Sequence, residues 1–155
     1  MLENPNSRKI IGFDAFGGFP QQERECDKAF IEKFEREAGR GITLDELNEV
    51  FKHKQISNYE MVKGDVLQTV PEYVSNHPEL KIALLHLDLD VYNPTKIALE
   101  CLFNKVVKKG LVVFDDYGTV EGATTAVDEY FAKNSIDLLI EKSSISHIPA
   151  YVRKI

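Results

Sequence analysis

The chain has 155 residues and a formal net charge of −6; 43% of its residues are hydrophobic and 28% are charged. These values are ordinary for a globular protein, so we expect a single domain over residues 1–155. The negative charge argues against nucleic acid or an anionic membrane as the main partner. The 2 cysteines make no disulfide framework, and neither a membrane span nor a signal-peptide hydrophobic region is present, so we expect a cytoplasmic location.

The first predicted strand is Lys9–Phe13, a short apolar run that ends at Asp14. An acidic residue in this place can accept hydrogen bonds from ribose hydroxyls, or it can simply belong to the turn. Residues 21–55 follow as a predicted helical insert, in which two glycines separate a narrow apolar stripe from a capping-box pattern at Thr43–Glu46. The insert fits a cover over a site and, equally well, a surface connection.

Strands and helices alternate along the rest of the chain, which is typical of an α/β fold. Lys81–Leu87 is apolar without alternation and predicts a strand that is buried on both faces. The other predicted elements are a strand over Asn58–Lys63 followed by Gly64 and Asp65, a helix from Val66 to before His77, a helix capped by Asn93 with Pro94 at its first position, a strand over Gly110–Phe114, a helix over Gly122–Lys133, and an antiparallel hairpin of Asp137–Lys142 and Ile148–Ile155. This order predicts a Rossmann-like, doubly wound α/β fold with a mostly parallel sheet and a C-terminal antiparallel hairpin.

Two of the predicted parallel strands end in pairs of carboxylates, Asp88 with Asp90 and Asp115 with Asp116. Ligands of open parallel sheets bind beyond the carboxyl ends of the strands, so we expect these side chains to share one rim. Three or four carboxylates in close proximity repel one another unless a cation offsets their charge, and Mg²⁺ prefers such oxygen ligands. Helix capping is the structural alternative for a single acidic strand end, but it explains two linked pairs less well.

Several of these segments together resemble a known family. They are Arg8–Pro20 (RKIIGFDAFGGFP), Gly64-Asp65 before a helix, Asp88-Leu89-Asp90-Val91-Tyr92, and a Gly-initiated strand that ends in Asp115-Asp116-Tyr117. The pattern resembles the class I S-adenosylmethionine (SAM) dependent methyltransferases, and within them the macrocin O-methyltransferase family, whose members methylate sugar hydroxyls in natural-product glycosides. The resemblance covers nearly the whole chain.

The resemblance implies a SAM- and Mg²⁺-dependent O-methyltransferase with a sugar or glycosylated small molecule as substrate. It implies that Asp88, Asp115 and Asp116 hold Mg²⁺ and that Asp88 takes the hydroxyl proton, with His147 as a less favoured base. Asp14 would hold the SAM ribose, and Gly64 with Asp65 would meet the adenine edge.

The chain departs from the family pattern at its beginning. The usual first strand and its Gly-rich turn, which hold the methionine end of SAM, are missing before Lys9. The alternatives are a fragment of a longer protein, a strand supplied by another chain, or a sheet that closes up. Unpaired strand edges would favour self-association into a homo-oligomer.

Two other functions compete with this interpretation. Asp88-Leu89-Asp90-Val91 also fits the Asp-x-Asp-x-Val/Thr signature of haloacid-dehalogenase-like phosphatases, with Asp88 as nucleophile, although that signature usually opens its domain. The second alternative is an α/β domain that binds a partner or a metal without catalysis.

Overall fold

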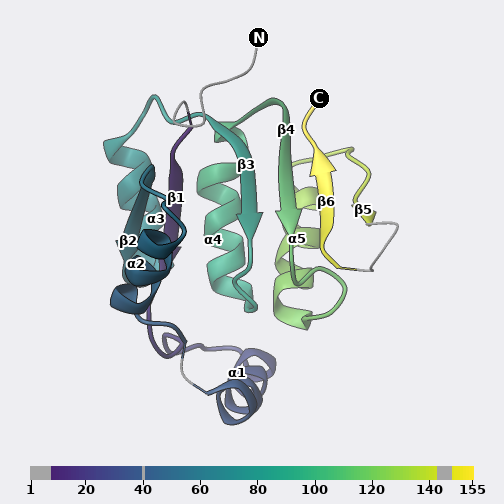
Figure 1. Ribbon diagram of the computed structural model, residues 1–155. Helices are drawn as coiled ribbons and strands as arrows, with labels where there is room; N and C mark the ends of the chain where they lie inside the picture. Colours follow the sequence, from purple (N-terminus) through teal and green to yellow (C-terminus); the bar gives the residue numbers. More distant parts are fainter. Residues whose placement is uncertain (1–7, 40, 143–147) are drawn as a thin grey trace.

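The computed structural model describes residues 8–39, 41–142 and 148–155. Its strands form two sheets, and each sheet contains one pair of parallel strands (Figure 1). β1 (Ile10–Asp14) pairs in parallel with β2 (Tyr59–Lys63). The second sheet has the order β3-β4-β6-β5, in which β3 (Ile82–Leu87) and β4 (Val106–Phe114) are parallel. β6 (Ala150–Arg153) runs antiparallel to β4, and β5 (Glu141–Lys142) runs antiparallel to β6. The predicted α/β fold with its antiparallel C-terminal end is confirmed.

The two sheets do not join through hydrogen bonds within the described residues. β1 has only β2 as a strand partner there, and β3 has only β4. Ile10 on β1 and Leu84 on β3 are 51% and 59% exposed, although both are large apolar residues. β1 and β3 therefore do not pair, and the alternative in which the sheet closes up is wrong.

Three helices cover one face of the sheets and form the core with them (Figure 1). They are α3 (Val66–Asn76), α4 (Tyr92–Leu102) and α5 (Glu121–Lys133). Leu85 and Leu87 of β3 pack into this core at 7% and 5% exposure, whereas Leu84 and His86 between them are exposed. The prediction that β3 is buried on both faces is therefore wrong, because the described helices cover only one face.

The predicted insert contains two helices, α1 (Glu25–Ala38) and α2 (Leu44–His53). The capping box at the start of α2 is confirmed, since the Thr43 side chain accepts from the Glu46 backbone while the Glu46 side chain accepts from the Thr43 backbone. Asp27 is the one buried residue of α1, and α2 has none. The core therefore receives almost nothing from the insert.

The boundaries of α4 differ from those predicted. The helix begins at Tyr92 rather than after Asn93, and its N-cap residue, Val91, has no side chain that can accept a hydrogen bond. Instead, Oδ2 of Asp27 accepts a hydrogen bond from the Tyr92 backbone at 3.1 Å. A carboxylate from α1 thus caps α4, which local sequence patterns cannot reveal.

The strands near the C-terminus also differ in length. β4 already begins at Val106, before the predicted start at Gly110, because Val106 pairs with Ile82 of β3. β5 covers only Glu141–Lys142 of the predicted strand Asp137–Lys142. Residues 143–147, including His147, lie outside the described residues.

Across the described ranges, no helix has both the length and the apolar character that a bilayer crossing requires.

Candidate cofactor pocket and acidic rim

The candidate site lies at the carboxyl ends of β1 to β4. Asp14 is the last residue of β1, Gly64 follows β2, Asp88 follows β3, and Asp115 follows β4. In Figure 1, α1 lies beyond this end of the strands. This end of an open α/β sheet is where ligands of such folds bind.

Three carboxylates meet at the ends of β3 and β4; we call Asp88, Asp115 and Asp116 the acidic rim. The register pairs Leu87 with Phe114, so the residues that follow them become neighbours. One carboxylate oxygen from each of the three residues lies within 4.8 Å of the other two. The structure therefore brings together the three residues that the sequence predicts as metal ligands, and carboxylate oxygens suit a hard cation such as Mg²⁺.

Asp116 is the buried member of the rim, at 8% exposure. Its Oδ2 accepts hydrogen bonds from the backbone of Leu89 at 3.2 Å and of Asp90 at 2.9 Å. These bonds hold the loop after β3, in which Asp90 adopts a left-handed conformation with φ 60°. The side chain of Asp116 therefore ties the loop that follows Asp88 to the end of β4.

The crowding of these carboxylates changes their protonation. Burial, followed by the charges of Asp116 and Asp115, raises the pKa of Asp88. Burial and the same kind of neighbouring charge raise the pKa of Asp90 to about 7. Burial also raises the pKa of Asp116, although the two backbone hydrogen bonds oppose it. A bound cation would reverse these shifts, since it favours the charged form of each carboxylate.

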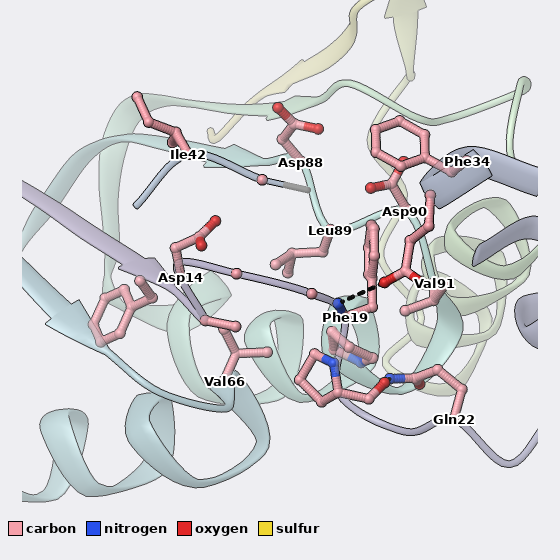
Figure 2. Close-up of a pocket in the computed structure, with 18 of the residues that line it drawn as sticks. Asp14, Phe19, Gln22, Phe34, Ile42, Val66, Asp88, Leu89, Asp90 and Val91 are labelled. Carbon is pink, nitrogen blue, oxygen red and sulfur yellow. Dashed lines mark hydrogen bonds between the residues drawn. The ribbon is translucent and has the colours of Figure 1, made fainter. Parts of the chain in front are cut away.

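A pocket of about 310 Å³ adjoins the rim (Figure 2). Its walls come from the end of β1 and the loop after it, from α1 and the segment that follows, and from the loop after β3. Much of the wall is apolar, including Phe19, Phe34 and Leu89. The ionisable side chains among the described lining residues are all carboxylates: Asp14, Glu35, Asp88 and Asp90. The pocket is therefore suited to a ligand that carries positive charge and hydrogen-bond donors.

The predicted cofactor residues are in different positions relative to this pocket. Asp14 lines it and also accepts a hydrogen bond from the backbone of Phe16. Gly64 lines it with φ 145°, a conformation that favours glycine, and a Cβ there would meet Thr69 at 2.8 Å. Asp65 does not line the pocket; its Oδ1 accepts from the Leu67 backbone at 2.9 Å and caps α3. A role of Asp65 at the adenine edge stays a prediction.

The insert contributes pocket residues that sequence reasoning did not single out. Phe34 and Glu35 of α1 line the pocket, and Oε1 of Glu35 accepts from the Phe19 backbone at 3.3 Å. Gln22 and Ile42 line it as well. Phe34 belongs to the narrow apolar stripe of the insert, and no spacing in the sequence indicates that the stripe faces a pocket. For α1 the cover interpretation fits, whereas α2 packs beside β2 through Phe51 and Tyr59.

Comparisons with known proteins agree with this fold. The family model of macrocin-O-methyltransferase (TylF) matches residues 1–154. The chain therefore belongs to the macrocin-O-methyltransferase family. A search of curated protein sequences gave no match.

Solved structures of methyltransferases share the fold. The O-methyltransferase NovP superimposes with a TM-score of 0.81 at 25% identity, over 96% of this chain and 60% of NovP. The calicheamicin methyltransferase CalS11 gives 0.69 at 26% identity, over 96% of this chain and 61% of CalS11. An rRNA methylase from Streptococcus thermophilus gives 0.55 at 16% identity, over 94% of this chain and 71% of that protein, which shows a shared fold alone. The chain thus spans about three-fifths of the length of NovP and CalS11.

Proposed function

We propose that this chain carries the cofactor pocket and the metal-binding rim of a SAM-dependent O-methyltransferase that acts on a hydroxyl of a sugar or a glycosylated small molecule. The observation that supports it most is the junction of an anionic pocket with three clustered carboxylates at the carboxyl ends of the strands. Family membership supports the same activity. One neighbouring structure, CalS11, is described as a TDP-rhamnose 3'-O-methyltransferase, which favours a sugar hydroxyl as acceptor.

The charge of the pocket supports SAM as the cofactor. SAM carries a positive sulfonium and an ammonium group, and its ribose hydroxyls are hydrogen-bond donors. Asp14 supplies acceptor oxygens for the ribose, and Gly64 lets a ligand approach the backbone closely because it has no side chain. Asp65 is proposed at the adenine edge, through the backbone at the start of α3 or after a change of its cap bond.

The acidic rim supports Mg²⁺ as the metal. Asp88, Asp115 and Asp116 would hold it, and when bound it lowers the pKa of an acceptor hydroxyl and orients that group. Asp88 is the exposed member of the rim and lines the pocket, so it is placed to accept the hydroxyl proton. SAM bound in the pocket would supply the methyl group for the acceptor oxygen, and S-adenosylhomocysteine would be the product left behind. Positioning of the two reactants contributes most of the rate.

The two competing functions have less support. The family match over residues 1–154 gives no reason to prefer a phosphatase. If the chain were a domain that binds a partner or a metal without catalysis, we would expect no binding in a cofactor titration. We also propose that the partner is a small molecule rather than nucleic acid, that the chain self-associates, and that its location is cytoplasmic.

Isothermal titration calorimetry with S-adenosylhomocysteine tests the proposed function. We expect saturable binding to the unmodified chain and at least tenfold weaker binding to Asp14→Asn, since an amide accepts fewer hydrogen bonds than a carboxylate. Asp137→Asn, an exposed aspartate in the segment between α5 and β5, is the matched control and should bind normally. Absence of binding to the unmodified chain would contradict the proposal.

A further inference from the structure

Two large apolar side chains are exposed at the pocket and have no role in the reaction proposed so far. Phe34, near the end of α1, is 39% exposed, and Ile42, in the segment between α1 and α2, is 47% exposed. Among the exposed large apolar residues that the structure describes, these two are the ones that line the pocket. Exposed apolar surface at a pocket is a mark of a ligand-binding site, because a ligand that covers it removes it from water.

Phe34 belongs to a cluster of aromatic rings. Its ring lies 5.9 Å from the ring of Phe30 in a stacked arrangement, and 5.6 Å from the ring of Phe19 in an edge-to-face arrangement. Phe19 lines the pocket as well. Phe19 and Phe34 therefore give this wall of the pocket an aromatic surface, against which another ring can pack.

The two apolar side chains share the pocket with the carboxylate that is proposed to take the acceptor proton. In Figure 2, Ile42, Asp88 and Phe34 lie along one side of the pocket, opposite Val66. An acceptor hydroxyl that reaches Asp88 brings the rest of the acceptor to this side. A group attached to the acceptor sugar then meets Phe34 and Ile42.

The charge of the pocket disfavours an anionic acceptor. The ionisable side chains among the described lining residues are the carboxylates of Asp14, Glu35, Asp88 and Asp90. A cation at the acidic rim would offset only part of this charge, since Asp14 and Glu35 lie outside the rim. The diphosphate of a nucleotide-activated sugar would be repelled by these groups, whereas an uncharged apolar group would not.

We propose that Phe34 and Ile42 form an acceptor-binding site for an apolar, preferably aromatic, group attached to the sugar, so that the acceptor is an uncharged glycoside and not a nucleotide-activated sugar. This inference rests on the proposed function and names the substrate class of the same site. The sugar hydroxyl faces Asp88, and the attached group packs against Phe34 and Ile42. In this respect the chain differs from CalS11, which is described as a TDP-rhamnose 3'-O-methyltransferase.

Calorimetric titration of matched acceptors tests the site, with Mg²⁺ and S-adenosylhomocysteine present. Phenyl rhamnoside and methyl rhamnoside differ only in the attached group, TDP-rhamnose carries a charged nucleotide in its place, and the phenyl and methyl glucosides repeat the comparison with a second sugar. For at least one sugar, we expect the unmodified chain to bind the phenyl glycoside roughly fivefold more tightly than the methyl glycoside, and phenyl rhamnoside to bind more tightly than TDP-rhamnose. Tighter binding of TDP-rhamnose, or no preference for a phenyl glycoside of either sugar, would overturn the proposal.

Variants at the two side chains assign this preference to them. Phe34→Ala should reduce the ratio of the phenyl to the methyl affinity by roughly three- to tenfold, and Ile42→Ala by about twofold. Phe34→Leu keeps an apolar side chain and should retain part of the preference. A merely structural role would weaken both glycosides equally and leave their ratio unchanged, and that result for both alanine variants would overturn the assignment. Val50→Ala is the matched control, because Val50 on α2 is also 39% exposed but does not line the pocket.

Binding of S-adenosylhomocysteine to the unmodified chain separates this inference from the proposed function. If S-adenosylhomocysteine binds and the phenyl glycosides show no preference, only the acceptor assignment fails. If S-adenosylhomocysteine does not bind, the proposed function fails and the acceptor assignment fails with it.

Discussion

The β3–β4 half of the molecule is packed far more tightly than the β1–β2 half. Phe114 at the end of β4 is 1% exposed, whereas Phe34 on α1 is 39% exposed. Nearly all buried hydrophobic residues lie from Val66 onward, and Phe16 is the exception among those described. The acidic rim therefore stands on a rigid base, while much of the pocket wall comes from elements with little apolar support. A site built in this way fixes the three carboxylates of the rim and leaves the wall of the pocket adjustable.

One buried carboxylate connects α1 to the tightly packed half. Asp27 is 1% exposed, caps α4 through Tyr92, and lies where Gly122 at the start of α5 has no side chain. A Cβ at Gly122 would come within 2.0 Å of Oδ1 of Asp27. The end of α1 near Asp27 is therefore anchored, although the pocket-facing end is not buried.

The largest expected effect is on the free energy of unfolding, and it separates Phe114 from Phe34. Phe114→Ala should lower the free energy of unfolding by about 3–5 kcal/mol, because it removes a fully buried aromatic side chain. Phe34→Ala should cost only about 1 kcal/mol, because much of that side chain already contacts water. Urea denaturation measures both values. Equal losses would contradict the difference in packing between the two halves.

The anchor of α1 gives the next largest effect. Gly122→Ala should destabilise the protein by about 1–3 kcal/mol through the clash with Asp27, although alanine is the better helix former. In the Asp27→Ala background the same substitution should cost less, because only the close approach of the Cβ to the Tyr92 backbone nitrogen, at 2.9 Å, remains. Chemical denaturation of the four proteins in this double-mutant cycle measures the coupling. Additive losses would show that Asp27 and Gly122 do not depend on each other.

The raised pKa of Asp90 predicts a pH dependence of stability. Because the folded-state pKa is about 7 and the ordinary value is 3.8, the folded protein holds a proton that the unfolded chain releases. The contribution of Asp90 to the free energy of unfolding is present below about pH 4 and is lost as the pH rises through 7. Asp90→Asn suits the left-handed backbone and should raise the free energy of unfolding at pH 8 by on the order of 1 kcal/mol, after solvent screening is considered. Thermal denaturation at pH 5 and pH 8 without divalent ions measures this, with Asp137→Asn as the control that leaves the pH dependence unchanged.

The smallest expected effect lies in the β1–β2 half. Thr43→Ala removes the capping box of α2, a local loss of about 1 kcal/mol, but α2 has no buried residue. We therefore expect faster hydrogen exchange in α2 and a change below about 0.5 kcal/mol in global unfolding. Thr125→Ala, inside α5, is the matched control and should not speed exchange in α2. A large global effect would mean that α2 unfolds together with the core.

Patterns that are local in sequence predicted most of the fold. The strands before Asp14, Asp88 and Asp115 and the capping box at Thr43 follow from short-range composition. The rim was predictable because parallel strands bring their ends together, so Asp88 and Asp115 had to be neighbours once the order of strands was known.

Contacts between distant elements were not predictable in this way. The start of α4 depends on Asp27, which lies 65 positions away along the chain. Gln22 and Phe34 line the pocket because of how α1 returns toward the strands, and nothing in their spacing encodes that. The uncovered face of β3 likewise depends on what packs against it and not on its own apolar run.

Calorimetric titration of Mg²⁺ tests the central claim, that the acidic rim is a metal site on the rigid half and is independent of the adjustable wall. We predict saturable binding to the unmodified chain, similar binding to Phe34→Ala, and at least tenfold weaker binding to Asp115→Asn, which removes one charged ligand while keeping the shape of the side chain. Normal Mg²⁺ binding by Asp115→Asn, or loss of binding in Phe34→Ala alone, would contradict the account.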